Sequence, residues 1–401
     1  MQTPTAVSTL VIAAAAATAP FLAASLRRFR VPAVLFELLL GILVGPSVLG
    51  WVSLDPFVTG LAAFGLAMLF FMAGYEIDLA ALRGTPLNRA LTGWGATVAL
   101  GLVVGLVLML SGVVISSLLV GLALTTTAIG TLLPMMRDRG LLGTRFGDLL
   151  SAAGAVGEFG PVVAVTLLLS TAAPGRQAAV LVGFVALTLV VGLVAVRYQP
   201  ARATALLDRH LHTSSQLPVR VALLLVAALV VLATQLGLDN LLGAFAAGMI
   251  VRLAVRPEQA VEVSSKLDAV AFGFFVPFFF VVSGVKFGLD ELADPATLVR
   301  VPLFLALLLV VRGLPALVVY RGILSGRARA ALAFLQSAAL PLLVVITEIG
   351  LATDRMRPAN AAALVGAGML SVLVFPLVGF GLLDRSPEGA APVSPDPAPT
   401  E

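Results

Sequence analysis

The sequence predicts an all-α polytopic membrane protein of about thirteen transmembrane helices, built as inverted repeats with two interrupted helices. Hydrophobic residues make up 60% of the 401 residues and charged residues only 11%, whereas soluble domains are nearer ~45–50% apolar and ~25% charged. Apolar runs long enough to cross a bilayer recur along the whole chain. The sequence contains no cysteine, which excludes disulfides, thiolate zinc sites and thiol catalysis.

Apolar runs of about 20 residues are expected to form the spanning helices. The fifth and twelfth runs are interrupted by polar or helix-breaking residues, and the ninth is short. The runs cover 5–26, 31–52, 60–81, 90–110, 114–136, 146–170, 178–198, 219–238, 240–255, 266–288, 298–320, 328–351 and 360–383.

Most basic residues follow the odd-numbered runs, beginning with Arg27, Arg28 and Arg30 after the first run. Loops rich in Lys and Arg stay on the cytoplasmic side of a membrane. We therefore expect a multi-pass protein of the cell (plasma) membrane, with its N-terminus outside and its C-terminus in the cytoplasm.

We expect residues 1–385 to form a single integral membrane unit. A first repeat covers about 31–198 and a second about 219–385, joined by the polar connecting segment 199–218. The Pro-, Ala- and acid-rich tail 386–401 is predicted to be a disordered cytoplasmic segment.

The repeats are inferred from short segments that recur in the same order. FFMAGYEIDL (70–79) resembles FVVSGVKFGL (280–289), GILVG (41–45) resembles AFAAG (244–248), and each half later carries a Thr- or Ser-containing run that ends in proline. The copies are separated by an odd number of helices, so the second is inverted. Inverted repeats with broken helices are typical of secondary transporters.

Two residues of opposite charge are expected near the middle of the membrane. At ~1.5 Å per residue, Glu158 lies ~18 Å into its run, and Arg312 lies at a similar depth. A charged side chain at the bilayer centre costs ~3 kcal/mol on insertion scales, which favours either a mutual pair or an aqueous cavity. A static Glu158–Arg312 bridge that only joins helices is the structural alternative.

A run of three threonines supplies a second candidate feature. Thr125, Thr126 and Thr127 precede Ile129 and Gly130, and Pro134 follows. Such a sequence favours a helix that unwinds at mid-depth and exposes carbonyl groups to a cation. In an intact helix, the same hydroxyls would bond back to carbonyls of the preceding turn.

Three further acids are secondary candidates. Glu76 is expected near the cytoplasmic end of the third run, where a solvated role is the simpler interpretation. Glu37 lies one or two turns into the second run, and Glu348 lies near an outer mouth where it could attract ions.

The motifs of common enzyme classes and binding proteins do not occur. The chain contains no Gly-x-Ser-x-Gly, His-Glu-x-x-His, Walker A or Gly-x-Gly-x-x-Gly motif, and both histidines lie in the connecting segment. Basic residues are scattered singly rather than clustered. We therefore expect no enzymatic activity, no cofactor and no nucleic-acid partner.

Three motifs resemble the monovalent cation:proton antiporter-2 family, which includes Kef-type and Nap-type exchangers. FELLLGILVGPSVLGW (36–51), with Glu37 at an acidic position, is similar to the family's Gly-Pro-Ser stretch; LFFMAGYEIDL (69–79) and FFVPFFFVVSGVKFGLD (274–290) are similar to its later motifs. The likeness covers roughly 30–383. It implies a sodium/proton antiporter-like fold of thirteen helices, with a mobile core domain that contains two crossed broken helices and a second domain that forms a homodimer.

The resemblance also implies roles for individual residues. Glu158 stands at the ion-binding acid, Arg312 at the basic residue facing the site, Thr125–Thr127 in the first broken helix and Gln336 in the second. The family usually has Asp, Asn or Gln where Gly157 stands, and its acid is Asp. Glu158 and Thr127 are the expected ligands of a monovalent cation.

Together, these observations predict a secondary transporter that exchanges Na⁺ or K⁺ for H⁺ by alternating access across the lipid bilayer. A single central acid predicts electroneutral 1:1 exchange with Glu158 as the shared site. The alternatives are an ion-coupled organic anion symporter with Arg312 as substrate anchor, and a non-transporting membrane scaffold or sensor.

Overall fold

The computed structural model describes residues 4–25, 32–76, 84–168, 174–197 and 216–389. These residues form helices, and their only β-type pairing is an isolated bridge between Arg321 and Leu324. The chain divides into two compact units, each of which combines segments from both halves of the sequence. Most of the predicted connecting segment 199–218 and the end of the tail, 390–401, lie outside the described residues.

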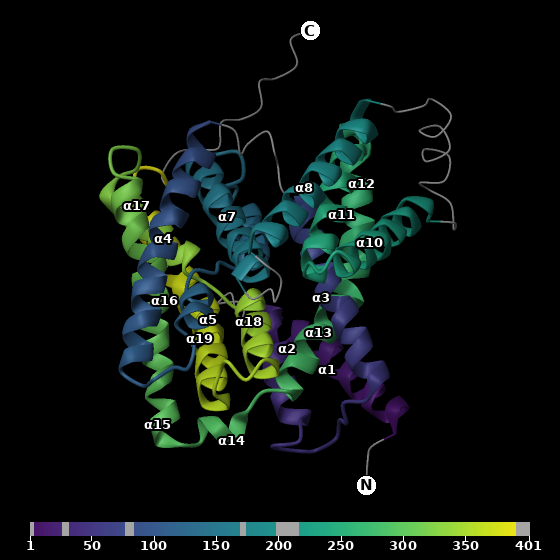
Figure 1. The fold of residues 1–401 in the computed structure, drawn as a ribbon, viewed down its shortest axis with the longest axis vertical. Helices are drawn as coiled ribbons and strands as arrows, with labels where there is room; N and C mark the ends of the chain where they lie inside the picture. The colour runs from purple at the N-terminus through teal and green to yellow at the C-terminus, as the bar shows by residue number, and fades with distance from the viewer. Residues whose placement is uncertain (1–3, 26–31, 77–83, 169–173, 198–215, 390–401) are drawn as a thin grey trace. The chain divides into compact units, whose positions relative to one another are not determined.

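The first unit comprises residues 1–78 and 162–290. Helix α11 packs against α3, α8 and α10, and α13 packs against α1, α2 and α3 (Figure 1). Its helices are α1 (Thr5–Ser25), α2 (Ala33–Val44), α3 (Pro56–Glu76), α8 (Pro174–Arg197), α10 (Leu217–Gln235), α11 (Asn240–Ala254), α12 (Pro257–Val270), the π-helical turn η2 (Ala271–Phe275) and α13 (Val276–Val285).

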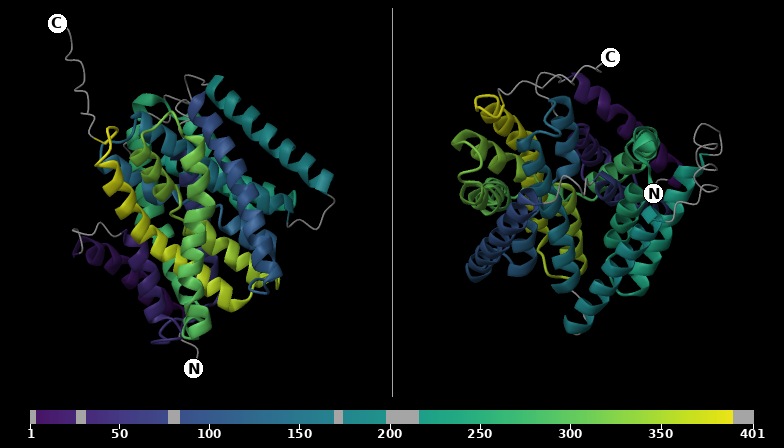
Figure 2. Two further views of the ribbon diagram at one scale, coloured as in Figure 1. Left: turned by 90° about the vertical axis from the view of Figure 1, so that its left-hand side faces the viewer. Right: turned by 90° about the horizontal axis from the view of Figure 1, so that it is seen from above.

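The second unit comprises residues 79–161 and 291–401. Helix α16 packs against α4, α17 and α19 (Figures 1 and 2). Its helices are α4 (Thr85–Leu110), α5 (Ser117–Ala123), α6 (Ile129–Asp138), α7 (Arg145–Leu168, whose last turns belong to the first unit), α14 (Leu289–Leu292, at the boundary), α15 (Pro295–Leu298), α16 (Arg300–Val319), α17 (Gly326–Gln336), α18 (Pro341–Ala352) and α19 (Pro358–Leu383).

Every predicted apolar run coincides with one or more of these helices. By length and composition, seven described helices can cross a membrane, and α17 with α18, which meet at a bend of 42°, make an eighth. Shorter apolar helices include α2 and α11. The all-helical membrane fold is therefore confirmed, whereas the number of thirteen spans stays a prediction.

Two glycine-lined helix crossings stabilise the first unit, and they match each other residue for residue. A Cβ at Gly41 would overlap the carbonyl of Val281, and one at Gly284 would overlap the carbonyl of Leu38. Small residues let membrane helices approach this closely.

The second crossing joins α3 and α11 in the same way. A Cβ at Gly248 would overlap the carbonyl of Phe71, and one at Gly74 that of Phe245. In both crossings each glycine meets the carbonyl three residues before its partner glycine. If the two crossings are repeats of each other, Gly41 on α2 is equivalent to Gly248 on α11. The sequence comparison of GILVG with AFAAG instead placed Gly45 opposite Gly248, one helical turn away. The matching crossings support the inverted repeat, which stays an inference.

Both predicted interruptions are real breaks in the helices of the second unit. Helix α5 ends at Ala123 and α6 begins at Ile129, while α17 ends at Gln336 and α18 begins at Pro341. The two breaks contact each other, because the N–H of Ala128 donates to the carbonyl of Ala338 at 2.7 Å. Proline suits the start of α18, since the first turn of a helix leaves its N–H groups unpaired.

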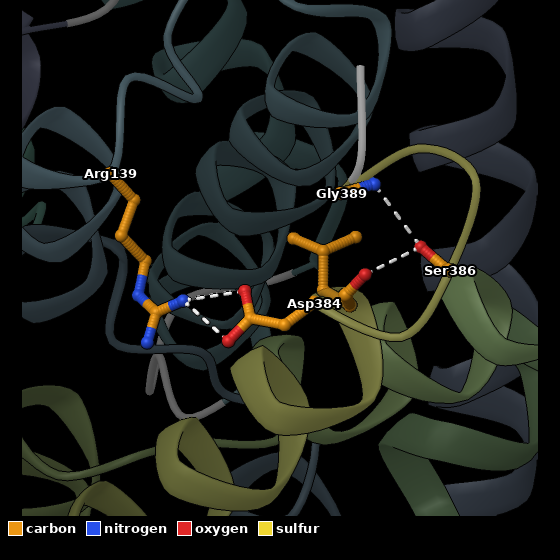
Figure 3. Close-up of polar contacts among 5 residues, drawn as sticks. Arg139, Asp384, Ser386 and Gly389 are labelled. Atoms are coloured by element: carbon orange, nitrogen blue, oxygen red, sulfur yellow. Dashed lines mark hydrogen bonds and ion pairs between the residues drawn. The ribbon is translucent and has the colours of Figure 1, made fainter. Parts of the chain in front are cut away.

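A turn after α19 binds the ends of two half-helices. Arg139, which follows α6, donates to both carboxylate oxygens of Asp384 at 2.8 and 3.2 Å (Figure 3). Glu388 accepts two hydrogen bonds from Ser325, the N-cap of α17, both at 2.7 Å. Residues 386–389 of the predicted disordered tail are thus hydrogen-bonded, with Ser386 accepting from the N–H of Gly389 (Figure 3).

Candidate functional site

The candidate site lies where the first break meets helix α7. Glu158 is buried, with 2% of its surface exposed, and its Oε2 accepts a hydrogen bond of 3.2 Å from the N–H of Ile129. Ile129 is the first residue of α6. The N-terminus of a helix carries a partial positive charge and unpaired N–H groups, both of which stabilise a carboxylate. The break therefore provides part of the environment that a buried acid requires.

The three threonines of the break are buried but differ in their partners. The hydroxyls of Thr125 and Thr126 donate to carbonyls three residues earlier, those of Leu122 and Ala123, at 2.7 and 2.8 Å. These two hydroxyls bond back to the preceding turn, although the helix is broken at this point rather than intact. A hydroxyl oxygen that donates in this way keeps lone pairs that can bind a cation.

Thr127 instead joins three helical segments. Its hydroxyl donates to the carbonyl of Gln336 at 2.6 Å and accepts from Nε of Arg312 at 2.8 Å. Its N–H donates to the carbonyl of Gly157 at 3.1 Å. Thr127 therefore connects the first break to the second, to α16 and to α7.

Three carbonyl groups of the first break are candidate ligands. In the described part of the chain, no hydrogen bond ends on the carbonyls of Thr125, Thr126 or Thr127, although all three residues are at most 1% exposed. In the second break, by contrast, the carbonyls of Gln336 and Ala338 accept from Thr127 and Ala128. Buried carbonyls without a hydrogen-bond partner are unfavourable unless a water or an ion binds them.

Arg312 lies on α16 and is 2% exposed. Besides Nε to Thr127, it donates from Nη2 to the carbonyl of Ala153 on α7 at 2.7 Å. Both hydrogen bonds end on uncharged oxygen atoms. Gln336 supports the same residue, because its Nε2 donates to the backbone carbonyl of Arg312 at 2.5 Å.

The three glycines of the sequence GAVGEFG allow side chains of neighbouring segments to pack directly against the backbone of α7. A Cβ at Gly154 would overlap the side chain of Ile129, and one at Gly160 would overlap the ring of Trp94. Gly157 faces Arg312 and Thr127. Ile129 and Ala153 were not among the predicted site residues, although the spacing Gly-x-x-Gly-x-x-Gly is a sequence signal that could have indicated this close packing.

The predicted residues fall into two groups. Glu158, the three threonines, Arg312 and Gln336 are brought together within the second unit by the contacts above. Glu348, on α18, belongs to the same unit. Glu37, buried on α2, and Glu76, the last residue of α3, belong to the first unit.

A helical membrane fold with two broken helices that meet beside a buried acid is typical of secondary transporters. Comparison with known families is more specific. The family model described as "Sodium/hydrogen exchanger, transmembrane" matches residues 13–385. The chain therefore belongs to the sodium/hydrogen exchanger family and is a multi-pass membrane protein.

Individual relatives agree with this assignment. YjbQ of Bacillus subtilis (strain 168) is 25% identical over 373 residues, which cover 88% of this chain and 59% of YjbQ. The Na⁺/H⁺–K⁺ antiporter GerN of Bacillus cereus is 28% identical over 267 residues, covering 66% of this chain and 67% of GerN. The chain thus spans about three fifths of the length of YjbQ.

The fold has a counterpart among solved structures. The sodium proton antiporter MjNhaP1 from Methanocaldococcus jannaschii superposes with a TM-score of 0.64 at 16% sequence identity, covering 94% of this chain and 98% of that one. At this identity the likeness concerns the fold alone, and it confirms the predicted antiporter-like architecture.

Proposed function

We propose that this protein exchanges a monovalent cation, Na⁺ or K⁺, for H⁺ by alternating access, with Glu158 as the shared binding site. The carrying observation is that Glu158, on α7, is buried with its carboxylate hydrogen-bonded to the first residue of α6. In the break that precedes α6, the carbonyls of Thr125, Thr126 and Thr127 accept no described hydrogen bond. Oxygen ligands from one carboxylate and several carbonyls suit a cation of low charge. The family and the named activities of relatives such as GerN support the same reaction.

Competition for one carboxylate explains how the two ions are coupled. Ionised Glu158 can bind the cation together with the carbonyls of Thr125, Thr126 and Thr127. Protonated Glu158 has lost the charge that attracts the cation. Exchange results if the protein switches the side of the membrane to which the site opens only when the site holds one ion or the other.

The site provides one carboxylate, which supports electroneutral 1:1 exchange. Position 157, which precedes Glu158, is a glycine, and the guanidinium of Arg312 fills the space where its side chain would lie. Arg312 is also buried and hydrogen-bonded to Thr127 and Ala153. It is therefore poorly placed to anchor an organic anion.

Reconstitution into proteoliposomes tests both exchange and stoichiometry. A pH gradient should drive uptake of Na⁺, K⁺ or Li⁺, and each cation should dissipate the gradient. With Na⁺ as the cation, K⁺ and valinomycin can clamp the voltage. One net charge moving through 100 mV would change the driving force by ~2.3 kcal/mol, so a clear voltage dependence would contradict 1:1 exchange.

The orientation is proposed from the distribution of basic residues, and assembly as a homodimer from the resemblance to antiporters. The chain has no cysteine, so single cysteines report their side of the membrane directly. In intact cells, a membrane-impermeant maleimide should label Glu291→Cys and not Arg385→Cys. The reverse pattern would contradict the orientation, and crosslinking in membranes should give a species of twice the monomer mass.

A further inference from the structure

Gly157 lies against Arg312, whose guanidinium occupies the place where a side chain at position 157 would lie. A Cβ at position 157 would overlap Nη2 of Arg312 and would lie 2.7 Å from its Cζ and 2.6 Å from Oγ1 of Thr127. Non-bonded atoms in proteins do not approach this closely. Any side chain at position 157 must therefore displace the guanidinium, Thr127 or both.

The guanidinium cannot move aside without losing its partners. Its Nε donates to Thr127 at 2.8 Å and its Nη2 to the carbonyl of Ala153 at 2.7 Å. Arg312 is 2% exposed, so water cannot readily replace these bonds. A buried cationic donor left without an acceptor is strongly unfavourable.

Helix α7 thus holds Thr127 in two ways. The carbonyl of Gly157 accepts from the N–H of Thr127 at 3.1 Å, and the carbonyl of Ala153 holds the guanidinium that binds the hydroxyl of Thr127. The carbonyls that accept no described hydrogen bond belong to Thr127 and the two residues before it. Their orientation relative to Glu158 therefore depends on this set of contacts.

We infer that Gly157 is a positioning residue for the cation site: the space left by its missing side chain holds the Arg312 guanidinium, which fixes Thr127 and the carbonyls of the first break beside Glu158. This inference rests on the proposed exchange at Glu158. The size of residue 157 then sets the apparent affinity for the cation, and Arg312 acts through its shape and hydrogen bonds as well as its charge.

A double-mutant cycle separates this role from a purely electrostatic one. The proteins are the wild type, Gly157→Ala, Arg312→Lys and the double variant. Lysine keeps the positive charge but has no Nη2 to overlap a Cβ at position 157. Gly95→Ala is the matched control, because Gly95 lies within α4 and its Cβ would have no atom within 4 Å.

Apparent KM and maximal rate of cation-driven proton exchange are measured in proteoliposomes, and the thermal unfolding midpoint in detergent. Gly157→Ala should raise KM about tenfold or more, the equivalent of one lost hydrogen bond to a charged group, with a smaller change in maximal rate. Arg312→Lys should raise KM less. The double variant should have a lower KM and a higher midpoint than Gly157→Ala, while Gly95→Ala resembles the wild type.

Two outcomes would overturn the inference. One is a Gly157→Ala protein that behaves like Gly95→Ala; the other is a double variant in which the two penalties simply add. Absence of exchange in the wild type would instead refute the proposed function. The unfolding midpoints of the same proteins would still test whether Gly157 and Arg312 are coupled, because that measurement requires no transport.

Discussion

Replacing Thr127 by valine tests how the two breaks are held together. Valine keeps the branched shape of threonine but has no hydroxyl. The variant loses the donation to the carbonyl of Gln336 at 2.6 Å and the acceptor for Nε of Arg312 at 2.8 Å. The N–H of Thr127, which binds Gly157, is unchanged.

The expected loss of stability follows from these two bonds. A hydrogen bond between neutral groups contributes ~0.5–1.5 kcal/mol and one to a charged group ~1.5–3 kcal/mol. Thr127→Val should therefore lower the free energy of unfolding by ~2–4.5 kcal/mol. Thr126→Val is the matched control, because Thr126 is equally buried but makes one local hydroxyl bond, to Ala123. It should lower the free energy of unfolding by ~0.5–1.5 kcal/mol.

Both variants are compared with the wild type by unfolding in detergent micelles, in a buffer where choline replaces Na⁺ and K⁺. Without a transported cation, loss of a cation ligand does not contribute to the difference. Thr127→Val should unfold at a clearly lower temperature or denaturant concentration than Thr126→Val. Equal destabilisation by the two variants would refute the assignment of Thr127 as the link between the breaks.

Two further predictions concern parts of the fold away from the site. Burial raises the pKa of Glu388, but its hydrogen bonds, chiefly from Ser325, outweigh this effect and hold the pKa below its ordinary value. Glu388→Gln should therefore destabilise the protein at neutral pH. Unfolding midpoints of the two proteins should converge as the pH falls below about 4.5, where the carboxylate becomes protonated. A midpoint difference that persists at low pH would contradict this. Gly248→Ala should lower the free energy of unfolding by ~1–3 kcal/mol through overlap with the carbonyl of Phe71, measured against Gly183→Ala, whose Cβ has open space; equal stability of the two variants would contradict the close crossing.

The sequence was sufficient to predict the helices, their two interruptions and the buried acid. Apolar runs and helix-breaking residues are local signals, and the structure has helices at the predicted positions. Glu158 could be identified because a carboxylate in an apolar run is rare and costly. Its position along the predicted helix, which corresponds to α7, was calculated from the rise per residue alone.

The partners of individual side chains could not be predicted in this way. The three adjacent threonines are chemically identical, so the sequence does not distinguish their hydroxyl partners. The backbone of the break turns Thr127 towards Gln336, whereas Thr125 and Thr126 bond within their own turn. The Gly157 carbonyl and the Arg312 guanidinium meet Thr127 because distant segments pack together. Nor does sequence order reveal that each compact unit combines both halves of the chain.

Whether Glu158 is the shared site of cation and proton is decided most directly by transport measurements on a variant without its charge. Exchange driven by a pH gradient is recorded in proteoliposomes for the wild type, Glu158→Gln and Glu291→Gln, an exposed carboxylate that serves as the matched control. We expect exchange in the wild type and Glu291→Gln, and none in a folded Glu158→Gln protein. Retained exchange in Glu158→Gln would place the shared site at another residue.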